Sequence, residues 1–369
     1  MERDTSKLRD RFEGCLLAGA AGDALGYAIE FWGEGEIFGR FGKGGIQTLE
    51  QAAAVSRSSV AHFSDDTQMT LFTANGLTYG MDRTGAAPQA RDIWLAYQEW
   101  LGTQDDESRL DDPAHPKMWL YGEPSLHALR APGGTCLGSL RTSRKGGTPE
   151  RRINGSKGCG GVMRVAPIGL LASVRDDVDA LRLGAEAAAL THGHPLGWLP
   201  AAFLASLVER LVLTDASNSA EGNASQLKAA IMDTLTEIEE RFSDVYQVDA
   251  LSVLVTDALR LAEQEQTDPQ GDLWRIHELG EGWVGEEALA IALYATLTHA
   301  DDIAATLRAA VNHKGDSDST GAIAGNILGA LVGRTALEEA FDLTQLEEPA
   351  LIIKVADSLL DHEPKEVAQ

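Results

Sequence analysis

The chain has 369 residues, which is enough for one large domain or two domains of ordinary size. Apolar residues make up 44% and charged residues 24%, a composition that argues against intrinsic disorder and against a fibrous protein. The formal net charge of −25 repels polyanions, so neither nucleic acid nor an anionic membrane surface is an expected partner.

The three cysteines, Cys15, Cys136 and Cys159, lack the spacing of metal ligands, and we expect reduced thiols in a cytoplasmic protein. The first residues are too polar for a signal peptide, and we expect residues 1–12 at the periphery of the fold. The apolar segment 14–29 is too short to span a bilayer and carries an Asp in its middle, so no membrane insertion is expected.

Residues 14–29 form the first predicted helix. Small residues recur there at every fourth position, so one face has almost no side chains: Gly14, Ala18, Gly22 and Gly26. Such a face lets a neighbouring helix approach closely, and we expect this helix at the centre of the fold. Asp23 and Glu30 stand two turns apart on one face. They are either acids that work beside a metal or, for the helix-terminal Glu30, an ordinary solvated side chain.

The segment Ser64-Asp65-Asp66-Thr67 precedes the second predicted helix, residues 66–79. Ser, Asp and Thr are preferred helix caps, so capping alone is a sufficient explanation for the segment in isolation. Carboxylate and hydroxyl oxygens are also the ligands that Mg²⁺ and Mn²⁺ prefer.

Further helical patterns follow along the chain, and convincing strands of alternating polarity are missing. The predicted helices span residues 89–101, 178–190, 195–213, 224–241, 248–264, 286–297 and 303–312, with one more after Gly321 and one after Leu346. Three long irregular stretches, residues 103–118, 131–161 and 267–285, are expected to be functional loops. Because no repeat or linker divides the chain, we predict one compact all-α domain over residues 1–369.

A glycine-rich segment, residues 156–164, leads into an apolar helix. Its backbone amides can form an anion cradle, although the spacing is neither that of a phosphate loop nor that of a dinucleotide fingerprint. The surrounding residues 141–164 carry one acid, Glu150, and seven bases: Arg141, Arg144, Lys145, Arg151, Arg152, Lys157 and Arg164. Either a phosphate-bearing ligand or a solvated basic loop accounts for this concentration of charge.

His192 and His194 occupy a break between two predicted helices. Histidine metal sites more often place both side chains on one helix face, so a metal role is disfavoured. Ligand contact, helix-end capping and structural packing all remain interpretations of the pair.

A second acidic segment, Asp316-Ser317-Asp318-Ser319-Thr320, again precedes a helical pattern. Its carboxylates stand two residues apart, whereas capping needs only one side chain. A calcium loop is excluded because the twelfth position is Ile327, where a bidentate Glu is required. Together with residues 64–67, the segment offers enough oxygens for two Mg²⁺ or Mn²⁺ ions, and metal-assisted hydrolysis becomes the leading hypothesis.

In this order, the motifs resemble those of the ADP-ribosylglycohydrolase family, which includes dinitrogenase-reductase-activating glycohydrolases and ADP-ribosylarginine hydrolases. The resemblance extends over nearly the whole chain and is carried by residues 14–17, 22–26, 30, 64–69, 158–167, 191–192, 279–283, 286–288 and 315–321. It implies a compact all-α fold with two Mg²⁺ or Mn²⁺ ions at the base of a cleft.

The resemblance also implies roles for individual residues. Glu30 and Asp66 would be catalytic, and Trp283 is assigned a packing role only. The metal ligands would be Ser64, Asp65, Asp66, Asp316, Asp318 and Ser319. The residues that line the pocket for the diphosphate and ribose would be Ser156, Gly158, Gly160, Gly161, Met163, Arg164 and His192.

Two positions depart from the family pattern. Many relatives carry Asn where this chain has Cys159, and some carry Asp where it has Ser156. The general base is therefore open between Glu30 and a metal-bound hydroxide.

The implied reaction is hydrolysis of the N-glycosidic bond between ADP-ribose and a protein side chain, with arginine as the expected acceptor. It would act on ADP-ribosylated protein or ADP-ribose and reverse the action of an ADP-ribosyltransferase toxin. A binuclear-metal nucleotide phosphohydrolase would use the same ions on another bond. A non-catalytic binding or immunity protein that captures a basic toxin is the third hypothesis, because strong negative charge steers such an association.

Overall fold

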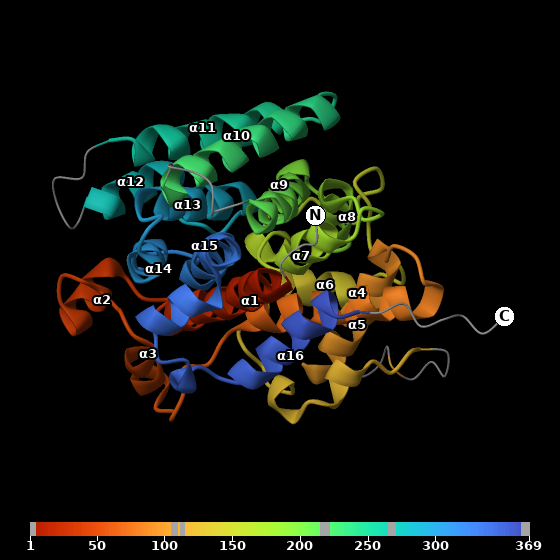
Figure 1. Cartoon of the computed structure of the whole chain (residues 1–369), viewed down its shortest axis with the longest axis horizontal. Helices are drawn as coiled ribbons and strands as arrows, with labels where there is room; N and C mark the ends of the chain where they lie inside the picture. Colours follow the sequence, from red (N-terminus) through yellow and green to blue (C-terminus); the bar gives the residue numbers. More distant parts are fainter. Residues whose placement is uncertain (1–4, 105–109, 111–114, 215–221, 265–270, 363–369) are drawn as a thin grey trace.

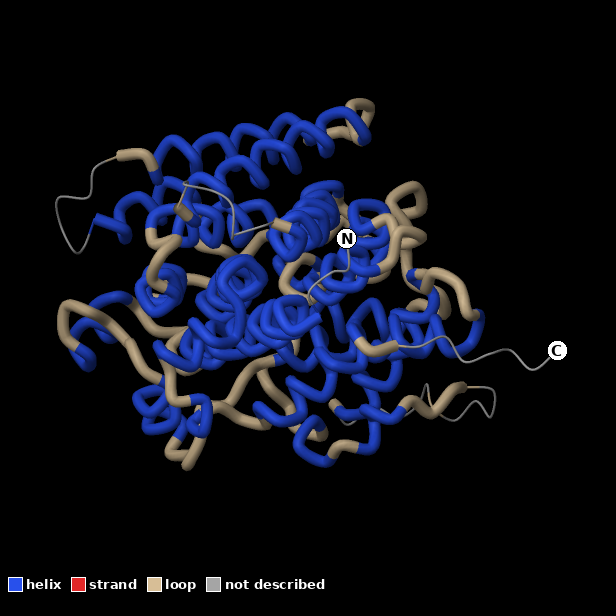
Figure 2. Tube along the Cα trace, in the orientation of Figure 1, coloured by secondary structure: helices blue, strands red, loops and turns tan. Residues whose placement is uncertain are grey.

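The computed structural model describes residues 5–104, 110, 115–214, 222–264 and 271–362. Within these ranges the chain forms helices joined by loops, with two isolated β-bridges and no strand (Figure 2). The prediction of one compact all-α domain is confirmed.

The described residues contain sixteen α-helices in chain order (Figure 1). They are α1 (Thr5–Tyr27), α2 (Glu34–Phe41), α3 (Leu49–Ser56), α4 (Asp65–Thr84), α5 (Ala90–Thr103), α6 (Gly134–Thr142), α7 (Ala166–Val174), α8 (Ala180–Ala189), α9 (Pro195–Leu213), α10 (Asn223–Arg241), α11 (Val248–Ala262), α12 (Gly271–Leu279), α13 (Gly285–Thr298), α14 (Ile303–Val311), α15 (Ser317–Ala340) and α16 (Pro349–Leu360).

Two of the stretches expected to be irregular contain a helix. Residues 131–161 include α6, and residues 267–285 include α12. The α6 sequence carries two glycines, which weaken local helix propensity, but it buries Cys136 and Leu140 against the core. The short helices α2 and α3 were not predicted either, because two turns give too little periodicity. The third stretch, residues 103–118, lies largely outside the described residues.

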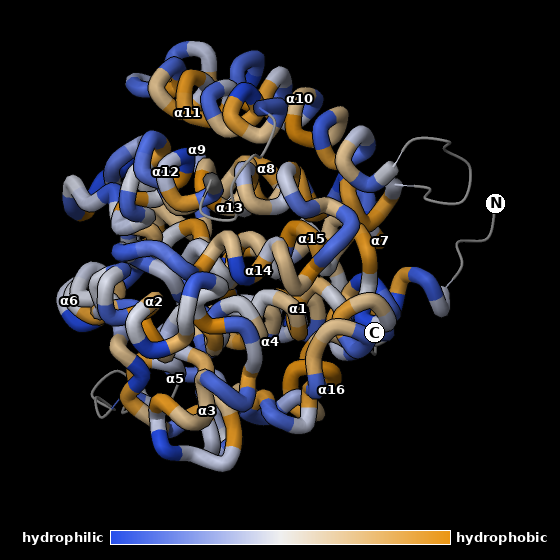
Figure 3. The backbone as a smooth tube through the Cα atoms, turned by 90° about the vertical axis from the view of Figure 1, so that its left-hand side faces the viewer, coloured by the Kyte–Doolittle hydropathy of each residue, from blue (hydrophilic) through white to orange (hydrophobic). Residues whose placement is uncertain are grey.

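The helices α1 and α15 lie next to each other near the middle of the molecule in both views (Figures 1 and 3). They run antiparallel, because Gly14 contacts Gly333 and Gly26 contacts Ser317. Their backbones touch, because a Cβ built on Gly22 would lie 2.1 Å from the carbonyl oxygen of Gly321. A Cβ on Gly325 would lie 2.1 Å from the carbonyl oxygen of Ala18. The expected central position of the glycine-striped helix is therefore confirmed, and its partner is the helix that follows the second acidic segment.

The N-terminal turns of α1 pass from the surface into the core. Thr5 and Ser6 are exposed, and residues 7–10 are half-buried, as expected of a peripheral segment. Arg11 is 3% exposed, and its guanidinium donates hydrogen bonds to the carbonyl oxygens of Leu211, Val212 and Thr214 at the end of α9. Phe12 is fully buried, so these two residues belong to the core, and residues 1–4 lie outside the described part.

Among the described residues, α9 alone is long and apolar enough to cross a membrane, judged by length and composition. Of the 18-residue apolar stretch in this helix, 83% is buried inside the protein, where α9 packs against α7 and α8. This burial accounts for the apolar composition of α9, since the core helices of a globular protein have the same character.

A carboxylate-lined cavity between α1, α4 and α15

Asp23 of α1 organises the start of α4. It is fully buried, and its carboxylate accepts hydrogen bonds from the backbone N–H of Ser64 at 2.8 Å and of Thr67 at 3.0 Å, and from the Thr67 hydroxyl. Burial is the main cause that raises the pKa of Asp23 to about 7. Because Asp23 caps α4, the side chains of Asp65 and Asp66 in its first turn are left for another task.

At the start of α15, too, an acidic side chain is left without a capping role. Asp316 stands at the N-cap position, yet its side chain makes no cap hydrogen bond. Ser317 instead donates to the carbonyl oxygen of Gly26 at 2.9 Å, which ties α15 to the end of α1. Asp318 accepts the backbone N–H of Ser319 at 2.9 Å.

Carboxylates from the end of α1 and from the start of α15 lie close together. Glu30, Asp316 and Asp318 are at most 7% exposed, and each offers an oxygen within 4.8 Å of the other two. Burial, and next the neighbouring charge of Asp318, raise the pKa of Glu30 to about 9. The same two causes raise the pKa of Asp65 and of Asp66 well above the ordinary range.

The donor set fits divalent cations. Buried like charges repel one another strongly unless positive charge compensates them. Glu30 Oε2 and Asp66 Oδ2 are buried and have no hydrogen-bond partner among the described residues. Carboxylate oxygens are hard ligands. Mg²⁺ and Mn²⁺ prefer such ligands more strongly than Zn²⁺ does. The carboxylates that could hold such ions are Glu30, Asp65, Asp66, Asp316 and Asp318.

These carboxylates line a cavity of about 200 Å³. Ten of the residues selected from the sequence line it: Glu30, Asp65, Asp66, Gly158, Gly160, Met163, His192, Asp316, Asp318 and Ser319. The fold thus brings together residues separated by almost 290 positions, because α1 and α15 pack side by side.

Four of the selected residues do not line the cavity. Arg164 is fully buried, its guanidinium lies 4.3 Å from the centre of the Tyr97 ring and donates to Thr191 Oγ1 at 2.7 Å, so the structure places it in the core and not in the cavity lining. Ser64 caps α4 through its Oγ, which accepts the N–H of Asp66. Gly161 and Ser156 also lie outside the lining, and the Ser156 hydroxyl is 3.0 Å from that of Thr135.

His192 reaches the cavity as a neutral imidazole. Burial, and next the charge of Arg164, lower its pKa to about 3. The Thr191 hydroxyl accepts from Arg164 and lies 2.8 Å from His192 Nδ1, which fixes the orientation of the imidazole ring. The other nitrogen, Nε2, lies beside Gly158 and Gly160. His192 thus presents Nε2 to the cavity.

The glycine-rich segment is fastened to the loop before α13. The backbone N–H of Cys159 donates to the carbonyl oxygen of Trp283 at 3.3 Å, so this amide is not available to an anion. The thiol of Cys159 donates to Asp316 Oδ2. Burial, and next the charge of Asp316, raise the pKa of Cys159 well above its ordinary value.

Trp283, which was assigned a packing role only, is 41% exposed and also lines the cavity. Its ring stacks on that of Phe31, with 6.3 Å between the ring centroids and 20° between the planes. Phe31 directly follows Glu30 and is 73% exposed. The cavity therefore opens beside an aromatic pair that periodicity could not reveal, because both residues lie outside the regular helices.

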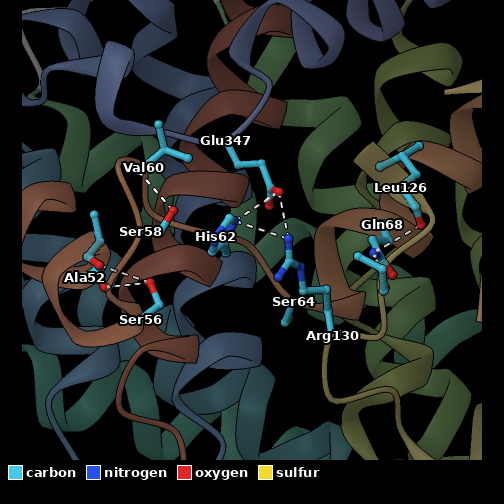
Figure 4. Close-up of polar contacts among 12 residues, drawn as sticks. Ala52, Ser56, Ser58, Val60, His62, Ser64, Gln68, Leu126, Arg130 and Glu347 are labelled. Carbon is cyan, nitrogen blue, oxygen red and sulfur yellow. Dashed lines mark hydrogen bonds and ion pairs between the residues drawn. The ribbon is translucent and has the colours of Figure 1, made fainter. Parts of the chain in front are cut away.

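The opposite wall is a loop anchored at Arg130. Figure 4 shows its guanidinium pointing to the carboxylate of Glu347, at 2.8 Å, with His62 beside them. The carbonyl oxygen of Arg130 accepts the backbone N–H of Asp65 at 3.0 Å, and the N–H of Gly133 donates to Asp65 Oδ2 at 3.2 Å. This loop therefore holds Asp65 in place from outside α4.

Buried carboxylates on helix starts at the base of a cavity define a candidate metal-dependent hydrolase. Residues 4–368 match the family model of the ADP-ribosylglycohydrolases, and the chain belongs to this family. Members of this family hydrolyse ADP-ribose conjugates.

Two curated relatives and one solved structure are similar to the chain. An ADP-ribosyl-(dinitrogen reductase) glycohydrolase of Rhodospirillum rubrum is 25% identical over 327 residues, covering 88% of this chain and 87% of the relative. The uncharacterised protein YegU of Escherichia coli (strain K12) is 25% identical over 339 residues, with 90% of each chain covered. A structure described as an ADP-ribosylglycohydrolase-related protein complex shares the fold, with a TM-score of 0.54 at 21% identity over 96% of this chain and 99% of the other.

Proposed function

We propose that this protein removes ADP-ribose from modified arginine side chains by hydrolysing the N-glycosidic bond with the help of two Mg²⁺ or Mn²⁺ ions. The observation that carries the proposal is the meeting of five buried carboxylates at the cavity base, two of them with an unpartnered oxygen. Family membership supports a hydrolase of ADP-ribose conjugates, and the Rhodospirillum rubrum relative is named for a modified protein.

The proposed roles follow from the positions of the side chains. Asp65, Asp66, Asp316 and Asp318 hold the ions, and Ser319 lies beside them in the lining. Bound ions of this kind acidify water and so supply a nucleophile near neutral pH. Bound cations would offset the carboxylate charges that help to raise the pKa of Glu30 and so would favour its ionised form. The unpartnered Glu30 Oε2 is then the proposed site that takes up a proton during the reaction.

Other residues of the cavity lining are proposed to contact the ribose and the phosphates of the substrate. We propose that the Nε2 of His192 donates a hydrogen bond to a ribose hydroxyl or a phosphate oxygen, with Nδ1 accepting from the Thr191 hydroxyl. Gly158 and Gly160 give the lining no side chains there, and a Cβ on Gly160 would lie 3.1 Å from the His192 ring. Glycine at this position therefore leaves room for both the imidazole and a ligand.

Two features support arginine as the acceptor. The aromatic pair Phe31 and Trp283 presents exposed ring faces at the mouth of the cavity. A guanidinium group is attracted to such faces and to the neighbouring carboxylate of Glu30. The hydroxyl of a serine acceptor would gain neither interaction.

The test is hydrolysis of ADP-ribosylated arginine and ADP-ribosylated serine substrates, with and without Mg²⁺ or Mn²⁺. We expect free ADP-ribose and intact arginine, and we expect Asp66→Ala and Asp316→Ala to lower the rate by orders of magnitude while the protein stays helical. Near-normal activity in both variants refutes the metal assignment. AMP and ribose phosphate as products would instead identify a phosphohydrolase. Protection against an ADP-ribosylating toxin without any hydrolysis product would identify a protein that captures the toxin.

The proposal also includes a cellular role, the reversal of ADP-ribosylation in the cytoplasm, including that made by a transferase toxin. The three cysteines support a reducing compartment, because all of them are free thiols in the structure. Expression of the wild type and of Asp316→Ala in cells that receive such a toxin tests this role. Protection by the wild type alone is the expected result, and equal protection by both contradicts it.

A further inference from the structure

The basic residues of segment 141–164 do not serve the carboxylate-lined cavity. Arg164 lies in the core, and Lys157 forms an ion pair with Glu286. None of the seven basic residues lines that cavity. Their concentration in a chain of net charge −25 therefore requires another explanation.

Two of them, Lys145 and Arg151, line a second cavity of about 530 Å³. It lies between the start of α5, the loop at residues 143–151 and α8. Four cations line it, with two acids, Glu150 and Glu186: the cations are Arg91, Lys145, Arg151 and Arg182. The cavity is thus locally basic on an acidic protein, which favours an anionic ligand.

The cations of the second cavity are not all neutralised by the protein. Arg182 pairs with Glu186 at 2.8 Å, and Arg151 donates to the carbonyl oxygen of Gly146 at 3.2 Å. Neither Arg91 nor Lys145 has an ion pair within the described residues, although both side chains are exposed at the same cavity. Two unpaired cations on facing segments, one guanidinium and one ammonium, are the usual receptors of a phosphate group.

The loop that carries Lys145 is fixed by its backbone. The N–H of Gly147 donates to the carbonyl oxygen of Leu190 at 3.1 Å, and Thr148 and Arg151 exchange backbone hydrogen bonds at 3.0 Å. Gly146 has a φ of +71° and packs so closely that a Cβ would lie 2.9 Å from the Trp94 ring. The second cavity is therefore preformed, and a ligand would meet little cost of ordering it.

One wall of the second cavity is apolar. Ala87, Pro88, Ala90 and Leu190 contribute to its lining, and Pro88 and Leu190 are buried. A bare phosphate ion would leave this wall in contact with water. A volume of about 530 Å³ has room for a phosphate together with a flat ring system.

We propose that the second cavity is a binding site for a nucleoside phosphate, with the phosphates between Arg91 and Lys145 and the base against the apolar wall. It is separate from the carboxylate-lined cavity, since the two cavities share no lining residue. Thr191 stands between them, and its carbonyl oxygen accepts hydrogen bonds from Ser139 and Asn154. The proposal does not depend on the reaction assigned above.

Calorimetric titration of the full-length protein with ADP, inorganic phosphate and adenosine tests the site. The double variant Arg91→Glu/Lys145→Glu reverses both unpaired charges. It should fold, because both side chains are exposed and Glu is favourable in the first turn of α5. The matched control is Arg144→Glu/Arg152→Glu, which makes the same charge change at exposed residues of the same segment that lie outside the cavity.

We expect one ADP site to weaken by about tenfold or more in the double variant, to stay in the control and to persist in Asp316→Ala. Inorganic phosphate should bind there more weakly than ADP, and adenosine more weakly still. Unchanged ADP binding in the double variant would overturn the proposal. So would equal weakening in the control pair, which would indicate net charge alone, or equal affinity for phosphate and ADP, which would leave the apolar wall without a role.

Discussion

The carboxylate of Asp23 on α1 accepts the backbone N–H of Ser64 at 2.8 Å, so a side chain 41 positions earlier in the sequence caps α4. Its other oxygen accepts the N–H of Thr67. We predict that Asp23→Ala lowers the free energy of unfolding by about 2–4 kcal/mol, because it leaves two buried amides unsatisfied. Denaturant unfolding followed by circular dichroism measures the change. Asp23→Asn, which keeps one acceptor oxygen, should lose less, and a loss below about 0.5 kcal/mol in Asp23→Ala would contradict the capping role.

The contact of α1 with α15 leaves no space for a methyl group. Gly22→Ala would place a Cβ 2.1 Å from the backbone of Gly321, and we predict a loss of about 3 kcal/mol or more of unfolding free energy. Gly39→Ala is the matched control, because Gly39 lies inside α2 with nothing within 4 Å of its Cβ position. That control should gain up to about 1 kcal/mol from its better helix propensity. Equal effects of the two substitutions would contradict the close backbone contact.

Divalent ions should stabilise the folded protein. A saturating concentration of Mg²⁺ or Mn²⁺, about a hundred times its dissociation constant, should add about 2.7 kcal/mol and raise the melting temperature in a thermal scan. The Asp66→Asn/Asp316→Asn double variant should show no such rise, while Asp301→Asn, an exposed acid outside the cavity, should respond as the wild type does. A rise that survives in the double variant would place the ions elsewhere.

His192 should make the stability depend on pH. Its pKa is about 3 in the folded protein and 6.5 in the ordinary state, so the unfolded chain binds a proton over this window and the folded protein does not. The contribution of His192 is therefore full above pH 6.5 and is lost as the pH falls toward 3, by up to about 1.4 kcal/mol per pH unit. The comparison is the free energy of unfolding of wild type and His192→Gln between pH 7 and pH 4. Parallel curves would mean that His192 is protonated in both states.

Trp283 should contribute to substrate binding. We predict that Trp283→Ala raises the KM for an ADP-ribosylarginine substrate by about tenfold, the worth of a desolvated cation–π contact, with a smaller effect on kcat. Trp274→Ala is the matched control, since this exposed tryptophan lies outside the cavity lining. Steady-state kinetics on arginine and serine conjugates separates the two roles. An equal rise in KM for both substrates would remove the guanidinium from the explanation.

Local patterns predict the parts of the site that stand on helix starts. Asp65, Asp66, Asp316 and Asp318 could be selected because acids in excess of capping needs stand out against helical periodicity. Arg164 could not be placed, since a basic residue beside a glycine-rich segment looks the same whether it faces a ligand or the core. The cap that Asp23 makes on α4 is a long-range contact, and no local pattern encodes it.

The helices also divide into those that the sequence predicts and those that it does not. The long helices α4 and α9 were predicted from their periodicity, since each places many apolar side chains on buried faces. The helix α6 depends on tertiary burial of a glycine-containing sequence, so its local signal is weak. Trp283 was assigned a packing role only, because packing is the commonest role of an aromatic residue, and only the fold shows that it also lines the cavity.

The pairing of α1 with α15 joins two segments that are far apart in the sequence and so leave the ribosome at different times. While Asp316 and the following residues are still inside the ribosome, the nascent chain lacks the carboxylates of Asp316 and Asp318. It also lacks α15, the glycine-lined partner of α1. The carboxylate cluster therefore cannot assemble until the start of α15 has left the exit tunnel. Truncated translation products should accordingly be inert toward ADP-ribosylated substrates.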